Sequence, residues 1–292
     1  MKPYELIELF RLPTLLPPAT GILSGAIASA VANGIVLNAG AIPALALASA
    51  SAMLLNGASN SFNQACDVKL DKINKPTRPL PSGRATAGEA TTLAAAAYAV
   101  ALIFAAMVGT AFMLLAGTAA LLTILYSWPA VRLKNHGWIA NAAIALPRGL
   151  LLLVAGWSVF ATPLSPAPWL MGSILGIFLL GAASTKDFAD MEGDRRYGAR
   201  TLPIIYGVRT AAWIMAPFLT LPFLLFAWGA AAGILPPAVA FLSLLSLWGA
   251  YIAHTIIRDP KRLASGENHP SWLHMYLLMA AAHLGIVTAY LI

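Results

Sequence analysis

Nine apolar stretches dominate this sequence, and each is long enough to cross a membrane as a helix. A transmembrane helix needs about 20 predominantly apolar residues, because each residue advances the helix by about 1.5 Å. The stretches lie at residues 12–33, 41–62, 89–107, 110–127, 138–158, 167–186, 208–231, 235–257 and 272–292. Only short connections remain between them in a chain of 292 residues. We therefore predict an all-α integral membrane protein of nine transmembrane helices, with one domain that covers residues 1–292.

The composition excludes a water-soluble globular enzyme. Hydrophobic residues make up 59% of the chain and charged residues only 10%, whereas a soluble domain typically carries about 25% charged residues. The single cysteine, Cys66, excludes an internal disulfide, and the histidines lack the spacing of a zinc site. Basic loops beside a membrane explain the net charge of +7. We therefore expect no nucleic-acid partner, and no feature indicates an obligate protein partner.

The charged residues predict the orientation of the chain in the membrane. Seventeen of the 18 Lys and Arg residues and all 11 Asp and Glu residues lie before the first stretch or at every second connection. The other connections, at residues 34–40, 108–111, 159–166 and 232–235, contain no charge. Because cytoplasmic loops carry the excess of Lys and Arg, we predict a cytoplasmic N-terminus and active site and a C-terminus outside.

Two acidic clusters lie where apolar stretches meet the predicted cytoplasmic side. The first cluster, at a spacing of four residues, consists of Asn63, Asp67 and Asp71. The second cluster, at spacings of three and four residues, consists of Asp187, Asp190 and Asp194. Both spacings place the side chains of a cluster on one face of a continuous helix. We therefore predict two acidic helix faces at matched depth.

The five aspartates of these clusters would repel one another near lipid unless a cation lay between them. Mg²⁺ is a hard cation that binds oxygen ligands, retains water and shares its coordination with substrate phosphates. Two acidic faces on opposite sides of a cavity could therefore hold Mg²⁺ and a diphosphate. The alternative is that the carboxylates only form ion pairs with neighbouring lysines and arginines at the membrane surface.

A basic loop follows the first acidic cluster. Residues 72–84 contain Pro76, Pro79 and Pro81 around the basic residue Arg78. Proline lowers the conformational entropy of a loop, and arginine suits bidentate contact with phosphate. This loop is therefore predicted to present a partly preorganised surface to a substrate anion; an ordinary basic cytoplasmic loop is the alternative.

Further candidate residues follow the fourth stretch and lie within the fifth. Arg132 and Lys134 could contact phosphate, and Tyr126 could present its ring to a developing carbocation. An interfacial aromatic and basic anchor is the alternative for this segment. Arg148 is the only basic residue well inside an apolar stretch, which favours a function for it, while pairing with a cluster carboxylate is the structural alternative.

Together these motifs resemble those of the UbiA superfamily of intramembrane prenyltransferases. The family carries an Asn-x-x-x-Asp-x-x-x-Asp motif after the second helix, which residues 63–71 match, and an Asp-rich motif after the sixth helix, which residues 187–194 match. The Lys-Pro-x-Arg-Pro-x-Pro-Ser-Gly loop at 75–83 and the Tyr-Ser-x-Pro segment at 126–134 are also similar. The likeness covers essentially the whole chain.

The resemblance implies a helical bundle around a central cavity, with a cytoplasmic cap and an apolar tunnel for a polyprenyl tail. It implies Mg²⁺ as cofactor, with the metal ligands Asn63, Asp67, Asp71, Asp187, Asp190 and Asp194. It also implies diphosphate contacts from Asn63, Arg78, Arg132, Lys134 and Lys186. The residues that it implies in catalysis are Asp67, Asp71, Asp190, Asp194 and Tyr126.

We therefore predict a prenyltransferase that moves a polyprenyl group from a prenyl diphosphate to a small lipid-soluble acceptor. We also expect the protein to be in contact with membrane lipid. Local likenesses favour an aromatic or quinone-precursor acceptor, with the digeranylgeranylglyceryl phosphate synthase and chlorophyll synthase reactions as alternatives. A terpene cyclase of the same superfamily is a further alternative. A membrane transporter is the alternative that is not an enzyme, but transporters place their sites near the bilayer midplane, whereas both clusters lie at one edge.

Overall fold

The computed structural model describes residues 2–265 and 269–292, and within this part the only β-bridge joins His136 to Arg200. The α-helices are α1 (Pro3–Phe10), α2 (Leu16–Ala32), α3 (Ile42–Cys66), α4 (Val68–Asn74), α5 (Ala87–Val108), α6 (Thr110–Ser127), α7 (Trp138–Ala145), α8 (Leu151–Trp157), α9 (Pro166–Ala182), α10 (Thr185–Ala189), α11 (Met191–Arg196), α12 (Leu202–Tyr206), α13 (Val208–Thr220), α14 (Leu224–Ala231), α15 (Leu245–Arg258), α16 (Pro260–Ser265) and α17 (Pro270–Leu291). The 3-10 segments are η1 (Leu12–Leu15), η2 (Ala39–Ala41), η3 (Leu133–Asn135), η5 (Leu221–Phe223) and η6 (Pro237–Leu244), and η4 (Leu146–Leu150) is a π-helical turn between α7 and α8.

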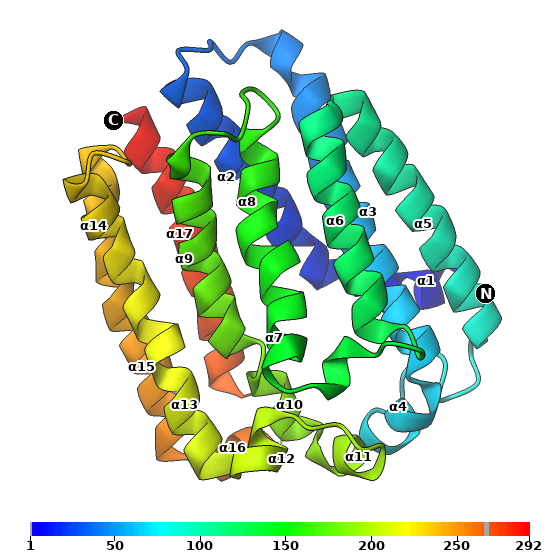
Figure 1. The fold of residues 1–292 in the computed structure, drawn as a ribbon. Helices are drawn as coiled ribbons and strands as arrows, with labels where there is room; N and C mark the ends of the chain where they lie inside the picture. Colours follow the sequence, from blue (N-terminus) through cyan, green and yellow to red (C-terminus); the bar gives the residue numbers. More distant parts are fainter. Residues whose placement is uncertain (1, 266–268) are drawn as a thin grey trace.

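Nine helical segments among the described residues are long and apolar enough to cross a membrane (Figure 1). They are Leu12–Ala32, Ala39–Cys66, Ala87–Val108, Thr110–Ser127, Trp138–Trp157, Pro166–Ala189, Val208–Ala231, Pro237–Arg258 and Pro270–Leu291. Each agrees with a predicted stretch to within a few residues. The predicted fold class, an all-α membrane protein of nine spans, is confirmed, and the chain is a multi-pass integral membrane protein.

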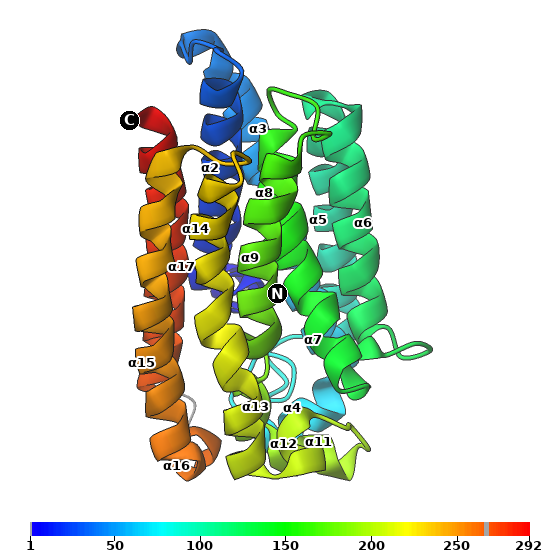
Figure 2. The same cartoon turned by 60° about the vertical axis from the view of Figure 1, so that its left-hand side comes forward.

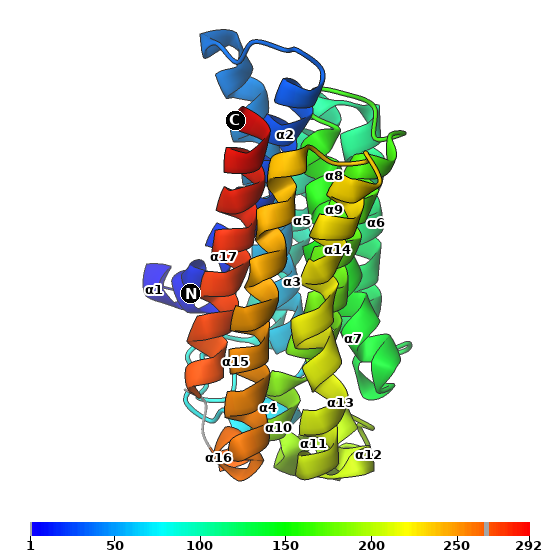
Figure 3. The same cartoon turned by 90° about the vertical axis from the view of Figure 1, so that its left-hand side faces the viewer.

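The short helices gather at one end of the bundle. In Figures 1 and 2, α4, α10, α11, α12 and α16 lie together at the lower end, where the charged connections are. The uncharged connections and the C-terminus lie at the opposite end. The helix α1 lies across the direction of the long helices at the side of the bundle (Figure 3). The polar part of the chain is therefore concentrated at one end, which we call the cap.

Buried apolar side chains form two main clusters. One cluster joins the C-terminal helices from α9 to α17 and includes Phe178 and Met275. The other joins α2, α3, α5, α6 and α8 and includes Ile22, Leu55 and Phe112. All five of these side chains also line a single large cavity. The cavity therefore lies between the two halves of the bundle.

Glycines allow α2 and α8 to approach closely. A Cβ atom added at Gly25 would stand 2.3 Å from the carbonyl oxygen of Leu153, and one added at Gly156 would stand 2.4 Å from the carbonyl oxygen of Ile22. Small residues at such crossings bring helix backbones into van der Waals contact within a membrane, where no hydrophobic effect drives helices together. This crossing fixes one wall of the cavity.

We predict that Gly156→Ala lowers the melting temperature of the protein in detergent. The added methyl group would meet backbone atoms, and overpacking of this kind costs about 1–3 kcal/mol. The matched control is Gly117→Ala, because a Cβ atom there meets no heavy atom within 4 Å, while both changes bring the same gain in helix propensity of about 1 kcal/mol. Equal melting temperatures for the two variants would contradict this account of the crossing.

Candidate active site

A cavity of about 540 Å³ extends from the cap into the bundle. Ten of the eleven predicted site residues line it, and the exception is Arg132, which reaches the cavity edge through its contact with Asp67. The part near the cap is polar, whereas the deeper part is bounded mainly by aliphatic and aromatic side chains such as Phe112, Phe178 and Met279. The two acidic clusters, which are more than one hundred residues apart in the chain, therefore face one space.

The helix that carries the first cluster is not continuous, so this prediction is wrong. Asp67 ends α3 and precedes α4, with φ −107° and ψ 11°, and its N–H donates to the carbonyl oxygen of Gln64 rather than to that of Asn63. The break occurs where the chain leaves the long span and turns into the cap. A matching break at Asp190, with φ −98° and ψ 3°, separates α10 from α11 in the second cluster.

Asp67 lies between two basic residues from the segment after α6. Arg132 Nη2 lies 3.0 Å from Asp67 Oδ1, and Lys134 Nζ forms an ion pair with Asp67 Oδ2. Asn63 Nδ2 donates to the same carboxylate over 3.0 Å and to Ser127 Oγ over 3.1 Å. Asp67 is only 5% exposed, so these cations and the amide compensate most of the cost of its burial.

Asp71 pairs with the predicted phosphate-binding residue of the basic loop. Arg78 Nη1 lies 2.8 Å from Asp71 Oδ2. Burial raises the pKa of the Asp71 carboxyl, and the positive charge and hydrogen bond of Arg78 oppose that rise. The loop after α4 is therefore folded back over the cavity by an ion pair between a predicted metal ligand and a predicted diphosphate contact.

Two residues of the first region connect it to the second cluster, and the sequence did not single out either. Lys75 Nζ lies 2.5 Å from Asp190 Oδ1 and 2.8 Å from Asp190 Oδ2. Asn74 Nδ2 donates to the carbonyl oxygen of Asp190 over 3.0 Å, and Asn74 Oδ1 accepts from the N–H of Gly193 over 2.9 Å. The motif Asn-Lys-Pro was visible as part of the basic loop, but its partner could not be known without the tertiary fold.

Two carboxylates of the second cluster form no ion pair with any described residue. Within the described residues, no ion pair or side-chain hydrogen bond involves the carboxylate of Asp187 or of Asp194, although Asp187 is only 8% exposed and both line the cavity. Burial, followed by the negative charge of Asp190, raises the pKa of Asp194 to about 6. The second cluster therefore contains two carboxylates on the cavity wall that pair directly with no described cation.

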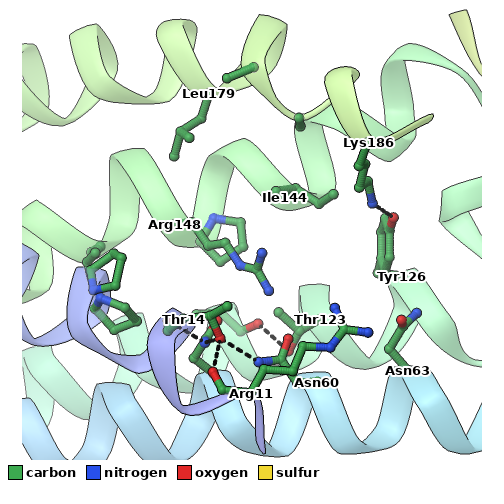
Figure 4. Close-up of a pocket in the computed structure, with 18 of the residues that line it drawn as sticks. Arg11, Thr14, Asn60, Asn63, Thr123, Tyr126, Ile144, Arg148, Leu179 and Lys186 are labelled. Atoms are coloured by element: carbon green, nitrogen blue, oxygen red, sulfur yellow. Dashed lines mark hydrogen bonds between the residues drawn. The ribbon is translucent and has the colours of Figure 1, made fainter. Parts of the chain in front are cut away.

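Lys186 and Tyr126 form a pair across the cavity wall (Figure 4). Lys186 Nζ donates to Tyr126 Oη over 2.5 Å and lies 5.0 Å from the centroid of the ring. The Tyr126 ring thus already lies beside a cation. Its predicted contact with a carbocation, and the predicted contact of Lys186 with diphosphate, stay predictions.

Two arginines that line the same cavity form no ion pair with any described residue. Arg148 points into the cavity in Figure 4, and within the described residues it pairs with no carboxylate, so the structural alternative of pairing with a cluster is not observed. Arg11, which the sequence did not single out, lies on the opposite wall. Its position immediately before an apolar stretch was visible, but its direction depends on an unusual backbone conformation that no sequence pattern indicates.

The oxygen ligands at the cap suit Mg²⁺. In the described part of the chain no three His, Cys, Asp or Glu side chains converge on a single point. A Mg²⁺ site does not require such convergence, because Mg²⁺ commonly takes one or two carboxylates and completes its octahedral coordination with water and substrate phosphates. The unpaired carboxylates of Asp187 and Asp194, both on the cavity wall, fit a cation of this kind.

The family model for UbiA prenyltransferases matches residues 21–278 of this chain. The chain belongs to the UbiA prenyltransferase family. Among relatives in this family, the digeranylgeranylglyceryl phosphate synthase of Ignicoccus hospitalis is 30% identical over 284 residues, which cover 93% of this chain and 88% of that protein. The chloroplastic chlorophyll synthase of Oryza sativa is 34% identical over 211 residues, which cover 69% of this chain. The match spans only 55% of that synthase, about half of its length.

Solved structures support the UbiA fold. A UbiA homolog from Archaeoglobus fulgidus, bound to GPP and Mg²⁺, has a TM-score of 0.70 to this chain at 21% identity and covers 97% of this chain and 99% of its own. At this level of identity the likeness establishes the fold. The recognition of the UbiA superfamily from the two motifs is confirmed, whereas the roles of individual site residues stay predictions.

We predict that Asn74→Ala loosens the link between the two motifs of this UbiA protein. The change removes two hydrogen bonds, each worth about 0.5–1.5 kcal/mol net. Hydrogen–deuterium exchange of the amides at 187–196 should therefore become about 10-fold faster. Lys72→Ala is the control, because Lys72 is an exposed neighbour on α4. Unchanged exchange in Asn74→Ala would show that the bridge does not stabilise the cap.

Proposed function

We propose that this protein is a Mg²⁺-dependent prenyltransferase that transfers a polyprenyl group from a prenyl diphosphate to a small lipid-soluble acceptor. The observation that carries the proposal is the convergence of both acidic clusters on one cavity that continues into an apolar interior. Membership of the UbiA family supports a transferase rather than a transporter. The Archaeoglobus homolog bound to GPP and Mg²⁺ supports the same class of donor and cofactor.

The metal would be held by oxygen atoms of the two clusters. The candidate ligands, directly or through water, are Asn63, Asp67, Asp71, Asp187, Asp190 and Asp194. When bound, Mg²⁺ supplies positive charge that stabilises the departing diphosphate. Asp187 and Asp194 are available without the loss of any ion pair, which makes the second cluster the more accessible half of the site.

The basic residues would bind the diphosphate by exchanging partners. Arg78 and Lys134 now compensate Asp71 and Asp67. If Asp71 and Asp67 held a cation, the guanidinium group of Arg78 and the ammonium group of Lys134 would be free to donate to phosphate oxygens. Such donors stabilise the charge that develops as the allylic C–O bond breaks. The ion pairs seen here therefore compensate Asp71 and Asp67 before donor and metal enter.

The apolar part of the cavity would hold the prenyl chain and exclude water. An allylic cation reacts readily with water, so the walls around Phe112 and Phe178 protect it until the acceptor attacks C1 and loses a proton. Tyr126 lines the same cavity from the last turn of α6. Its ring can stabilise positive charge on C1 if Lys186 moves to the diphosphate.

The motifs and the relatives rank the candidate acceptors. Our first proposal is an aromatic or quinone-precursor acceptor, because the local likenesses of the motifs favour it. An ether-lipid acceptor is the second, because the Ignicoccus digeranylgeranylglyceryl phosphate synthase matches this chain along nearly its whole length. The chlorophyll synthase alternative is supported by a shorter match. A cyclase would use the same ionisation without an external acceptor.

We also propose that the cap lies on the cytoplasmic side. The charged connections gather at that end and the uncharged connections at the other. The N-terminus would then be cytoplasmic and the C-terminus outside, since an odd number of spans separates them.

The decisive test incubates the purified protein with labelled geranylgeranyl diphosphate, Mg²⁺ and a panel of acceptors, and identifies the product by mass. Asp67→Ala and Asp190→Ala should lower turnover at least about 100-fold, because each removes charge stabilisation of the leaving group. Melting temperatures check that both variants stay folded. Glu192→Ala is the matched control, since Glu192 is an exposed acid of the same segment outside the cavity. Turnover near the wild-type rate in the two aspartate variants would refute the assignment.

The apparent affinity of the protein for a divalent cation should decrease as the pH is lowered. Asp194 has a pKa of about 6 and binds a cation only when ionised, so between pH 7.5 and 5.5 its protonation weakens binding about 4-fold. Mn²⁺ binding followed by electron paramagnetic resonance, with a prenyl diphosphate analogue present, measures this. The same titration of the Asp194→Asn variant is the control, because it measures the part of the pH dependence that comes from protonation of the analogue. An identical pH dependence in the variant would contradict the role of Asp194.

A further inference from the structure

One face of α6 lines the cavity from the cap toward the opposite end of the bundle. Five residues of this face follow one another at helical spacings of three and four, and they are Tyr126, Thr123, Ala119, Ala116 and Phe112. The two alanines leave space beside the helix, because each side chain is a single methyl group. Phe112, by contrast, places an aromatic ring on the same face and is only 1% exposed. The face therefore changes from small to bulky within one turn of the helix.

Phe112 lies where the cavity ends, far from the cap. It is the third residue of α6, and no described residue of α6 farther from the cap lines the cavity. On α8, the lining residue farthest from the cap is Ala155, two residues before that helix ends. Phe112 and Ala155 belong to the same buried cluster, and α6 packs against α8 (Figure 1). The cavity therefore closes between these two helices at the level of Phe112.

The length of this face matches that of a short prenyl chain. Its cap end lies at the first acidic cluster, because Asn63 Nδ2 donates to Ser127 Oγ over 3.1 Å. Phe112 lies fourteen positions before Tyr126, which is about 21 Å along a helix. Three bonds of an extended chain span about 3.6 Å, so the four chain bonds of one isoprene unit span about 5 Å. A chain of about four units therefore fits between the cluster and the ring.

Another wall of the cavity is polar at a similar depth. His283 lines the cavity thirteen positions after Pro270, the first residue of α17, which is about 20 Å along that helix. The His283 Nδ1 atom lies 2.8 Å from Ser24 Oγ, whereas its Nε2 atom is buried without a hydrogen-bond partner among the described residues. A hydrocarbon chain against this nitrogen would exclude the water that could bond to it. We therefore expect an apolar chain to follow the alanines of α6.

The Phe112 ring occupies about the space of one further isoprene unit, because a phenyl ring and an isoprene unit are similar in volume. Beyond the ring lies Gly109, where an added Cβ atom would meet no heavy atom within 4 Å. Loss of the ring would therefore lengthen the tunnel by about one unit. A ring at Ala116, which is about 6 Å nearer to the cap, would shorten it by about one unit.

We propose that Phe112 limits the prenyl chain of the donor to about four isoprene units by filling the end of the tunnel. The inference rests on the proposed transferase function and adds a limit on donor length to it. The ring is about 21 Å from the cap end of α6, so it selects donors by length and leaves the chemistry at the diphosphate unchanged. A longer chain would have to displace the ring or leave the tunnel between helices.

The test measures Mg²⁺-dependent binding of prenyl diphosphates of increasing length, from geranyl to hexaprenyl diphosphate. Displacement of labelled farnesyl diphosphate from the purified protein gives the Kd of each without an acceptor. The variants are Phe112→Ala, Phe112→Leu, Ala116→Phe and the double variant Phe112→Ala/Ala116→Phe. For each length, the ratio of the variant Kd to the wild-type Kd cancels the partition of the chain into detergent.

The control is Phe226→Ala, because Phe226 of α14 is also fully buried but does not line this cavity. His283→Leu tests the polar wall. Melting temperatures check that each variant is folded, and Ala116→Phe tests the proposal even if Phe112→Ala does not fold.

We expect the wild-type protein to bind a five-unit chain about 10-fold more weakly than a four-unit chain, because the fifth unit would overpack against the ring. In Phe112→Ala the two chains should bind within about twofold of each other, and Phe112→Leu should be intermediate. Ala116→Phe and the double variant should weaken binding of the four-unit chain about 10-fold and change that of the two-unit chain less than about twofold. Phe226→Ala should keep the wild-type ratios.

The proposal fails if the wild-type protein binds chains of four and six units equally. It also fails if neither Phe112→Leu nor Ala116→Phe changes the ratios between lengths. Relief of the limit by His283→Leu instead of Phe112→Ala would overturn it too, because the chain would then follow α17. Absence of Mg²⁺-dependent binding at every length would refute the proposed transferase function itself, whereas binding without a length limit refutes only the role of Phe112.

Discussion

The pairing of carboxylates with cations at the mouth of an apolar cavity is the interaction on which the cap depends. A carboxylate in such surroundings is costly unless an opposite charge lies against it. Asp67 receives its cations from the segment after α6, and Asp71 receives its cation from the loop after α4. The cation that pairs with Asp190 is Lys75, which lies more than one hundred positions earlier in the chain. Charge compensation therefore also determines which segments of the cap meet.

Charged side chains that form no ion pair with a described residue indicate where a ligand of opposite charge could bind. Asp187 and Asp194 leave negative charge near the cap, and Arg11 and Arg148 leave positive charge elsewhere in the same cavity. A soluble protein could leave such groups to water, but a cavity within a membrane bundle offers little of it. The unpaired carboxylates suit a cation with its diphosphate near the cap, as proposed above.

Much of this architecture could be predicted from the sequence. The nine spans were identified to within a few residues, because the thickness of the bilayer's hydrocarbon core sets the length of apolar helix needed to cross it. The two acidic clusters were found because charge is scarce in this chain. The continuous helix faces were wrong, since the breaks at Asp67 and Asp190 arise where the spans end and the cap begins. Asn74 was missed because a single amide in a loop gives no sign of its distant partner.

By itself the sequence determined the class of fold, the end of the bundle that carries charge and the residue types available for chemistry there. Hydrophobicity and charge decide these properties locally, one segment at a time. Only the tertiary structure decided which carboxylates are compensated and which are not. It also decided that Arg11 and Arg148 share a cavity. These properties depend on distances of a few ångströms between segments far apart in the chain, and backbone irregularities such as the left-handed Arg11 and the π-helical turn set those distances.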